Sequence, residues 1–265
     1  MVKGKCKLCL KDNVEIVNSH IVPSWAYKRI RENNSKQPDP ICIERDKTYS
    51  TSKQLKEYML CKDCESKIKV FEDFASEITY NKNGDSSFIS NYKGECKEYT
   101  ELKVYSLNKD QAESLRKFAL SVAWRASIAK SKKLKGVDLG EKYNEIARLS
   151  LNNEIEIPQN ISIFCYLHRN IHNNKLYNFI EEPKTYKEKK YHKTSFVICG
   201  LYCRLHVGKI IPEIEKGLDL CLSKFSFLIY AKKEEAGSMK VLRNMIDNSK
   251  LSKRLQEEQN ISNTV

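Results

Sequence analysis

The first eighty residues alternate short apolar stretches with polar connections. Residues 14–20 alternate between apolar and polar positions, which predicts a strand that ends near His20. A turn leads into a short helix over residues 25–30, and a polar, loop-like stretch follows over residues 32–54. Residues 65–80 then have apolar residues at helical spacing, so we expect a second helix there.

The remainder of the chain has one long helical pattern followed by strand patterns. Asn108 with Gln111 is typical of a helix N-terminal cap. Apolar residues follow at helical spacing, namely Leu115, Phe118, Ala119, Val122, Ala126 and Ala129, with Trp124 and Arg125 off the centre of that stripe. A second helix is expected over about 139–149, strands at 86–105, 161–167, 195–207 and 218–230, and a last helix from Ser238.

A polar break at residues 81–85, which includes Gly84, is the clearest boundary signal in the first half of the chain. We therefore expect two domains, residues 1–82 and residues 83–265. The mixture of helical and strand patterns predicts an α+β protein, and 265 residues are enough for a substantial core.

The chain is strongly basic, with a formal net charge of +13. Such an excess favours a polyanionic partner, because phosphate neutralisation releases counterions. The alternative is a lysine-rich surface that binds nothing. No run approaches the roughly 18 apolar residues of a membrane span, and no secretory signal precedes the first cysteines. We expect a cytoplasmic protein without membrane association.

Two of the chain's cysteine pairs have metal-ligand spacing. Cys6 with Cys9 and Cys61 with Cys64 each form a C-x2-C pair, whereas the other six of the ten cysteines are irregularly spaced. Four thiolates satisfy tetrahedral zinc and leave no open coordination position. The pattern predicts a structural zinc site, which by itself says little about activity.

The segment between the two pairs contains Asn18-Ser19-His20-Ile21-Val22-Pro23. The motifs follow one another in the order first C-x2-C pair, this segment, second C-x2-C pair and Glu65. This order resembles the zinc-bearing HNH (ββα-metal) endonuclease family over roughly residues 5–75. The resemblance implies a zinc-stapled ββα-metal module that hydrolyses phosphodiester bonds, with double-stranded DNA as the expected substrate. Family members often serve in bacterial restriction or anti-phage defence.

The resemblance also implies roles for individual residues. His20 takes the place of the general base that activates water, and Glu65 that of the helix ligand for a catalytic Mg2+ or Mn2+. The chain departs from the family pattern at three points. Ser19 replaces the usual Asp or His and is expected to take only a weaker part, Glu65 replaces His or Asn, and Gln54 stands in for the middle Asn that orients the base.

Two readings without catalysis remain open. One is an inactive zinc-ribbon protein that binds nucleic acid or a protein partner. The other is a structural or regulatory member of a complex, with residues 83–265 as its interface or as a surface for oligomerisation.

Other polar residues have less specific patterns. Glu72 shares a helix face with Glu65 but lies about 10.5 Å further along the axis, so it is expected at the surface or paired with Lys69. Two basic stretches could grip a phosphate backbone or be solvated loops, namely residues 184–193 and the group Lys130, Lys132, Lys133 and Lys135.

Overall fold

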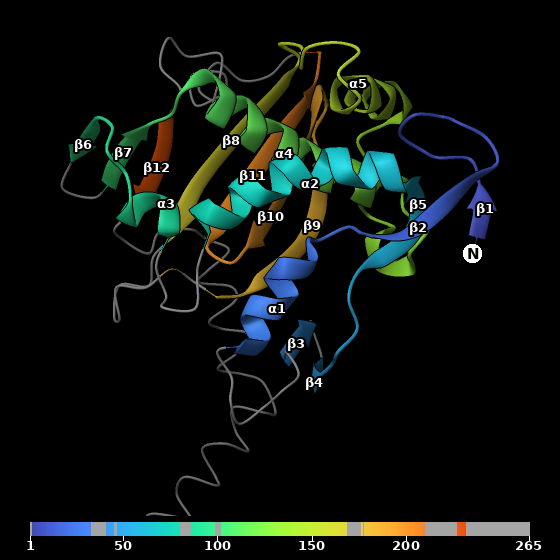
Figure 1. The fold of residues 1–265 in the computed structure, drawn as a ribbon, viewed down its shortest axis with the longest axis horizontal. Coiled ribbons are helices and arrows are strands. Elements are labelled where there is room, and N and C mark those ends of the chain that lie inside the picture. Colours follow the sequence, from blue (N-terminus) through green and yellow to red (C-terminus); the bar gives the residue numbers. More distant parts are fainter. Residues whose placement is uncertain are drawn as a thin grey trace, which may run out of the picture.

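The computed structural model describes residues 2–32, 41–44, 47–79, 86–98, 102–168, 176, 178–209 and 227–231. Within these ranges the chain combines helices with three sheets, so the α+β prediction is confirmed (Figure 1). The expected break at residues 81–85 and the expected last helix from Ser238 lie outside the described residues.

A small antiparallel sheet and a helix form the N-terminal unit. The sheet has the order β1-β2-β5, with β1 at Val2–Gly4, β2 at Val14–His20 and β5 at Lys56–Cys61. Helix α2 (Lys62–Ile78) follows β5 without a connecting loop, so the strand's direction fixes where the helix starts. Helix α1 (Ser24–Glu32) and the hairpin of β3 (Ile41–Glu44) and β4 (Lys47–Ser50) lie between β2 and β5 in the sequence. The predicted strand ending at His20 and the first two predicted helices are confirmed. The expectation of a loop-like stretch over 32–54 is wrong in part, because Ile41–Glu44 and Lys47–Ser50 pair as the β3–β4 hairpin.

A seven-stranded sheet forms the second layer, in the order β6-β7-β12-β8-β11-β10-β9. All neighbouring strands in it are antiparallel except β12 and β8, which are parallel. The bounds are β6 Cys96–Glu98, β7 Leu102–Ser106, β8 Ile161–His168, β9 Ile180–Lys187, β10 Tyr191–Ile198, β11 Leu201–Gly208 and β12 Phe227–Ala231.

Two of the predicted strands are wrong in detail. The expected single strand over 195–207 is a hairpin of β10 and β11, because Cys199 (φ 48°) and Gly200 (φ 86°) form a tight turn with two left-handed residues. The stretch 86–105 begins with the short helix α3 (Ser87–Ser90), because the Ser86 side chain caps it by accepting from the amide of Ile89.

Helix α4 (Lys109–Ile128) lies between α2 and the large sheet, and α5 (Glu141–Leu151) packs beside it (Figure 1). The predicted capping box of Asn108 and Gln111 is present. Because α4 is covered from both sides, its burial is not limited to one stripe. Trp124 and Arg125, expected off the stripe's centre, are also buried.

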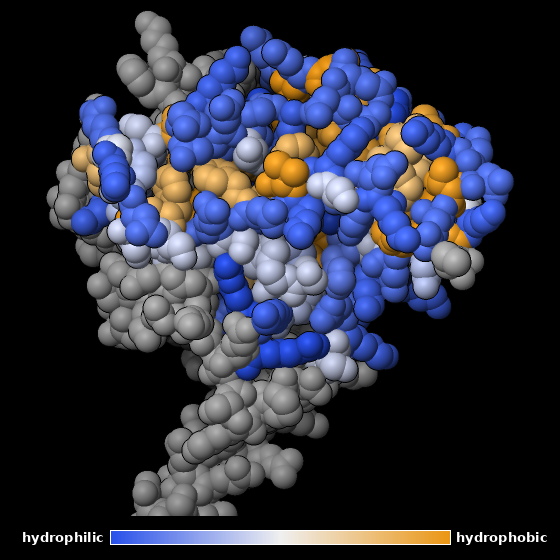
Figure 2. Space-filling model, viewed as in Figure 1, coloured by the Kyte–Doolittle hydropathy of each residue, from blue (hydrophilic) through white to orange (hydrophobic). Residues whose placement is uncertain are grey.

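The hydrophobic core is continuous from the N-terminal unit to the large sheet. Buried residues such as Ile68 on α2, Phe118 on α4 and Leu205 on β11 belong to one cluster. The viewed face is mostly hydrophilic, with hydrophobic groups scattered across its middle (Figure 2). Among the described helices, none is long and apolar enough to cross a membrane.

Candidate functional site

The four predicted zinc ligands converge in space. The sulfur atoms of Cys6, Cys9, Cys61 and Cys64 all lie within 4.8 Å of one another, and the group could hold a metal ion. The Sγ atoms of Cys9 and Cys61 are 3.9 Å apart. In a zinc tetrahedron with bonds of about 2.3 Å, sulfur atoms lie about 3.8 Å apart. The donor set and its spacing therefore fit zinc.

Backbone hydrogen bonds shape the loop that carries the first two cysteines. The amide of Leu10 donates to the carbonyl oxygen of Cys6 at 3.0 Å, and Leu10 adopts a left-handed φ of 61° to close that turn. The amide of Lys7 donates to the carbonyl of Met59 at 2.9 Å, which ties the loop to β5. The amide of Cys61 points at the Cys6 sulfur, 3.3 Å away.

The surroundings affect the acidity of the thiols differently. Burial disfavours the Cys6 thiolate, but backbone hydrogen bonds from Cys61, Cys9 and Leu8 outweigh it and lower the pKa of Cys6 to about 7. Burial, together with neighbouring sulfur groups, raises the pKa values of Cys61 and Cys64. A cluster of four thiolates therefore requires a bound cation.

His20 ends β2 and is held by Gln54. The imidazole Nε2 lies 2.7 Å from the Gln54 Oε1 atom. With that amide oxygen as acceptor, Nε2 carries the proton and Nδ1 has the lone pair. The backbone next to the pair is also fixed, since Ile21 donates to the carbonyl of Leu55 at 2.9 Å and Leu55 donates to the Tyr27 hydroxyl at 3.0 Å. The structure thus brings Gln54, the proposed substitute for the middle Asn, to the predicted base.

The other two predicted site residues have different surroundings. Ser19 is fully buried, and its hydroxyl is directed to the carbonyl of Val17 at 3.5 Å. Glu65 lies in the first turn of α2 beside Cys64 and is partly exposed. Its Oε2 atom is buried without a hydrogen-bond partner. An unsatisfied buried carboxylate oxygen is the kind of atom that a cation would complete.

A buried arginine from α4 lies next to the His20 strand end. Arg125 Nη1 donates to the carbonyl oxygen of His20, and Nη2 forms a 2.7 Å ion pair with Glu72 Oε1. The Arg125 side chain is 1% exposed and that of Glu72 is 15% exposed. The expectation that Glu72 lies at the surface or pairs with Lys69 is therefore wrong.

Simple geometry explains why Glu72 reaches this point. Ile16 pairs with Cys61 at the start of α2, and His20 lies four residues further along β2, a distance of about 13 Å at 3.3 Å per residue. Glu72 is ten residues beyond Lys62, about 15 Å along the helix at 1.5 Å per residue. Glu72 is thus level with His20, whereas Glu65 lies closer to the cysteine cluster.

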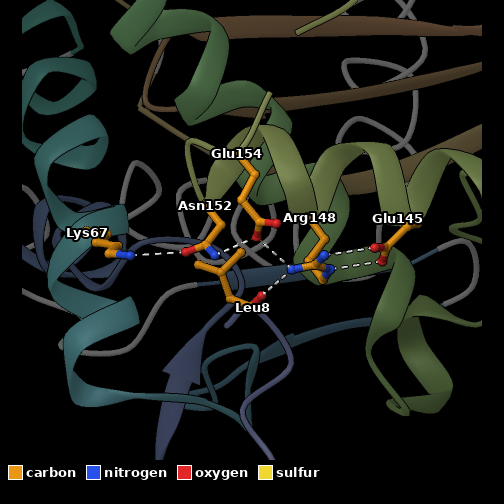
Figure 3. A network of polar contacts seen from close by, with 6 residues as sticks. All are labelled: Leu8, Lys67, Glu145, Arg148, Asn152 and Glu154. Carbon is orange, nitrogen blue, oxygen red and sulfur yellow. Dashed lines mark hydrogen bonds and ion pairs between the residues drawn. The ribbon is translucent and has the colours of Figure 1, made fainter. Parts of the chain in front are cut away.

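A second arginine ties the cysteine loop to α5 (Figure 3). Arg148 donates to the carbonyl of Leu8 at 2.9 Å and pairs with Glu145 and Glu154 at 2.8 and 3.1 Å. Asn152 links this group to α2, since it donates to Glu154 at 2.7 Å and accepts from Lys67 at 3.0 Å. Helix α5 therefore holds the loop through Arg148, and the end of α5 is in turn bonded to α2.

Comparisons with known proteins leave the chain without a match. No family model, no curated protein and no solved structure is significantly similar to it.

Loss of one cluster thiolate should unfold the N-terminal unit. In small zinc peptides the metal supplies roughly 10–16 kcal/mol of folding energy, so Cys61→Ser should release zinc and expose the β2 and β5 amides to hydrogen exchange. Cys96→Ser is the matched control, because Cys96 is exposed and outside the cluster. Folded protein that contains no zinc, or equal stability of the two variants, would contradict the zinc assignment.

Removal of Arg125 should strongly destabilise the fold. Arg125→Met leaves the Glu72 carboxylate largely buried without its partner, so the free energy of unfolding in urea should fall by about 3–5 kcal/mol. The double variant Arg125→Met/Glu72→Met should lose less than the sum of the single changes. Lys109→Met, at the exposed start of α4, should stay within about 0.5 kcal/mol of wild type. An Arg125→Met variant as stable as that control would refute a structural role for the pair.

Proposed function

We propose that the protein is a metal-dependent endonuclease that hydrolyses phosphodiester bonds in DNA. The observation that carries the proposal is the His20–Gln54 contact at the end of β2, in a hairpin and helix closed by four cysteines. The pairing of β2 with β5 and the helix α2 that follows β5 support the proposal, because the resemblance expects two strands and then a helix.

His20 is the proposed general base. A neutral imidazole with one protonated nitrogen can accept a proton from water through the other. Gln54 is the proposed positioning residue, because its amide oxygen fixes both the tautomer and the ring orientation. The Arg125 contact to the His20 carbonyl holds the backbone from the other side.

Glu65 is the proposed ligand for a catalytic Mg2+ or Mn2+, which would lie on the cysteine-cluster side of His20. Its buried Oε2 has no hydrogen-bond partner, whereas the Glu72 carboxylate is already paired with Arg125. A hard divalent ion prefers carboxylate oxygens, and when bound it would stabilise charge on a scissile phosphate. Ser19 contributes no ligand in this proposal, because its buried hydroxyl is directed to the Val17 carbonyl.

A second candidate function is a zinc-stapled binder of nucleic acid without catalysis. The observation in its favour is the charge balance beside His20. There the Arg125 cation neutralises Glu72, and Ser19 occupies the position at which the family has a metal-binding side chain. The two functions differ in one property, which is the cleavage of plasmid DNA with Mn2+.

His20→Ala should abolish plasmid nicking in Mn2+ without loss of fold or zinc. A positioned general base contributes about 10²–10⁴-fold, so the rate should fall by that factor. Gln54→Ala should cause a smaller loss and Gln54→Asn should restore part of it, with the pH profile displaced because the imidazole is no longer fixed. If the His20→Ala variant still nicks plasmid DNA, His20 is not the general base. If the wild-type protein never nicks it, the second candidate function, binding of nucleic acid without catalysis, is favoured.

Glu65→Gln should separate a metal ligand from a helix cap. If Glu65 binds the ion, the Mn2+-dependent rate should fall by orders of magnitude while stability stays near wild type. If Glu65 only caps α2, the change should cost about 0.3–1 kcal/mol and leave nicking unchanged. Glu72→Gln is the comparison on the same helix, and it should lower stability because Arg125 loses its charged partner. Nicking lost in Glu72→Gln at unchanged stability would transfer the ligand role to Glu72.

A further inference from the structure

The two basic stretches noted in the sequence lie side by side in the fold. The segment after α4 is tied to the edge of the large sheet through Asp138. The Asp138 amide donates to the Thr185 hydroxyl at 3.2 Å, and its carboxylate pairs with Lys187 at 2.8 Å. His192 Nδ1 lies 3.0 Å from the Asp138 carbonyl oxygen. Lys187 and the lysines after α4 therefore belong to one surface.

The same segment also reaches the hairpin that carries His20. The amide of Lys130 donates to Glu57 Oε2 at 2.8 Å, and Glu57 is paired in register with Ser19, next to His20. Lys133 Nζ lies 3.2 Å from the Tyr49 hydroxyl on β4 and 5.9 Å from the centre of its ring. The segment thus connects the candidate site with the edge of the large sheet.

We name this surface the basic edge and define it as Lys130, Lys132, Lys133, Lys135 and Lys187. All five side chains are exposed. Two carboxylates contact the basic edge, those of Glu57, which accepts from the Lys130 amide, and of Asp138, which pairs with Lys187. The Lys187 ammonium and the Gly140 amide hold the pKa of Asp138 below its ordinary value, so it stays ionised at neutral pH. The basic edge keeps a positive excess after these contacts.

We propose that the basic edge binds the phosphate backbone of a nucleic acid duplex and extends the contact surface of the His20 site. Lysine serves as a point charge for phosphate, whereas it is depleted in the cores of protein interfaces. A protein partner would need apolar anchors, whereas the exposed large hydrophobic residues at the basic edge are two tyrosines, Tyr49 beside Lys133 and Tyr186 next to Lys187 in the chain. The inference rests on the proposed function for its substrate class, and it concerns binding rather than cleavage.

The test is a salt titration of duplex binding. Fluorescence anisotropy of a labelled DNA duplex, without added divalent ions, gives the slope of log K against log salt. Each neutralised phosphate contributes about −0.9 to that slope. The triple variant Lys132→Gln/Lys133→Gln/Lys135→Gln should therefore bind with a slope shallower by about 2.7, and its affinity at low salt should fall at least tenfold.

A matched control removes the same charge elsewhere. Lys69, Lys93 and Lys109 are exposed on α2, after α3 and at the start of α4, and Lys109 is at the opposite end of α4 from the basic edge. Their combined change to Gln should leave the slope near that of wild type. Equal behaviour of the two triple variants would overturn the proposal, as would binding of polyglutamate in preference to the duplex.

The binding measurement and the cleavage measurement test the basic edge and the nuclease independently. His20→Ala should bind the duplex with the wild-type slope, because it removes no lysine. If wild type never nicks DNA but has a steeper slope of log K against log salt than the triple lysine variant, the nuclease proposal is refuted and the basic-edge proposal is supported. If the triple variant Lys132→Gln/Lys133→Gln/Lys135→Gln nicks DNA and its slope of log K against log salt equals that of wild type, the nuclease proposal is supported and the basic-edge proposal is refuted. An RNA duplex run in parallel shows whether the backbone of either nucleic acid suffices.

Discussion

Four cysteine sulfurs converge at one point and join the loop after β1 to β5 and to the start of α2. Cys6 and Cys9 come from a loop after β1, whereas Cys61 ends β5 and Cys64 lies in the first turn of α2. Closing these segments fixes the register of the hairpin and the direction in which α2 leaves it. Sulfurs this close cannot all be charged without a cation between them, so a metal such as zinc would complete the cluster in its thiolate form.

Two buried arginines extend that constraint into the rest of the chain. Arg125 joins α4 to the His20 strand end and to α2, and Arg148 joins α5 to the cysteine loop. Each guanidinium donates to one backbone carbonyl of the N-terminal unit, that of His20 or that of Leu8. The position of His20 therefore depends on helices from the second half of the sequence, although its hairpin is local.

The sequence predicted the features that local patterns determine. Alternation indicated β2, the Asn108 and Gln111 pair indicated the start of α4, and ligand spacing indicated the cysteine cluster. Gln54 was found because the motif required a partner for His20 at about that place. The Arg125–Glu72 ion pair was missed because it joins residues far apart in sequence, although an arginine within an apolar helix was a usable signal. The β10–β11 turn was missed because Cys199 is an unusual residue for a left-handed conformation.

X-ray absorption at the zinc edge of the purified protein measures the ligands of the bound metal. We expect one zinc per chain, with four sulfur neighbours at about 2.3 Å and no nitrogen or oxygen bound to the metal. A folded protein without zinc, or a zinc with mixed sulfur, nitrogen and oxygen ligands, would contradict the claim that these four cysteines organise the hairpin, the helix and the His20 site.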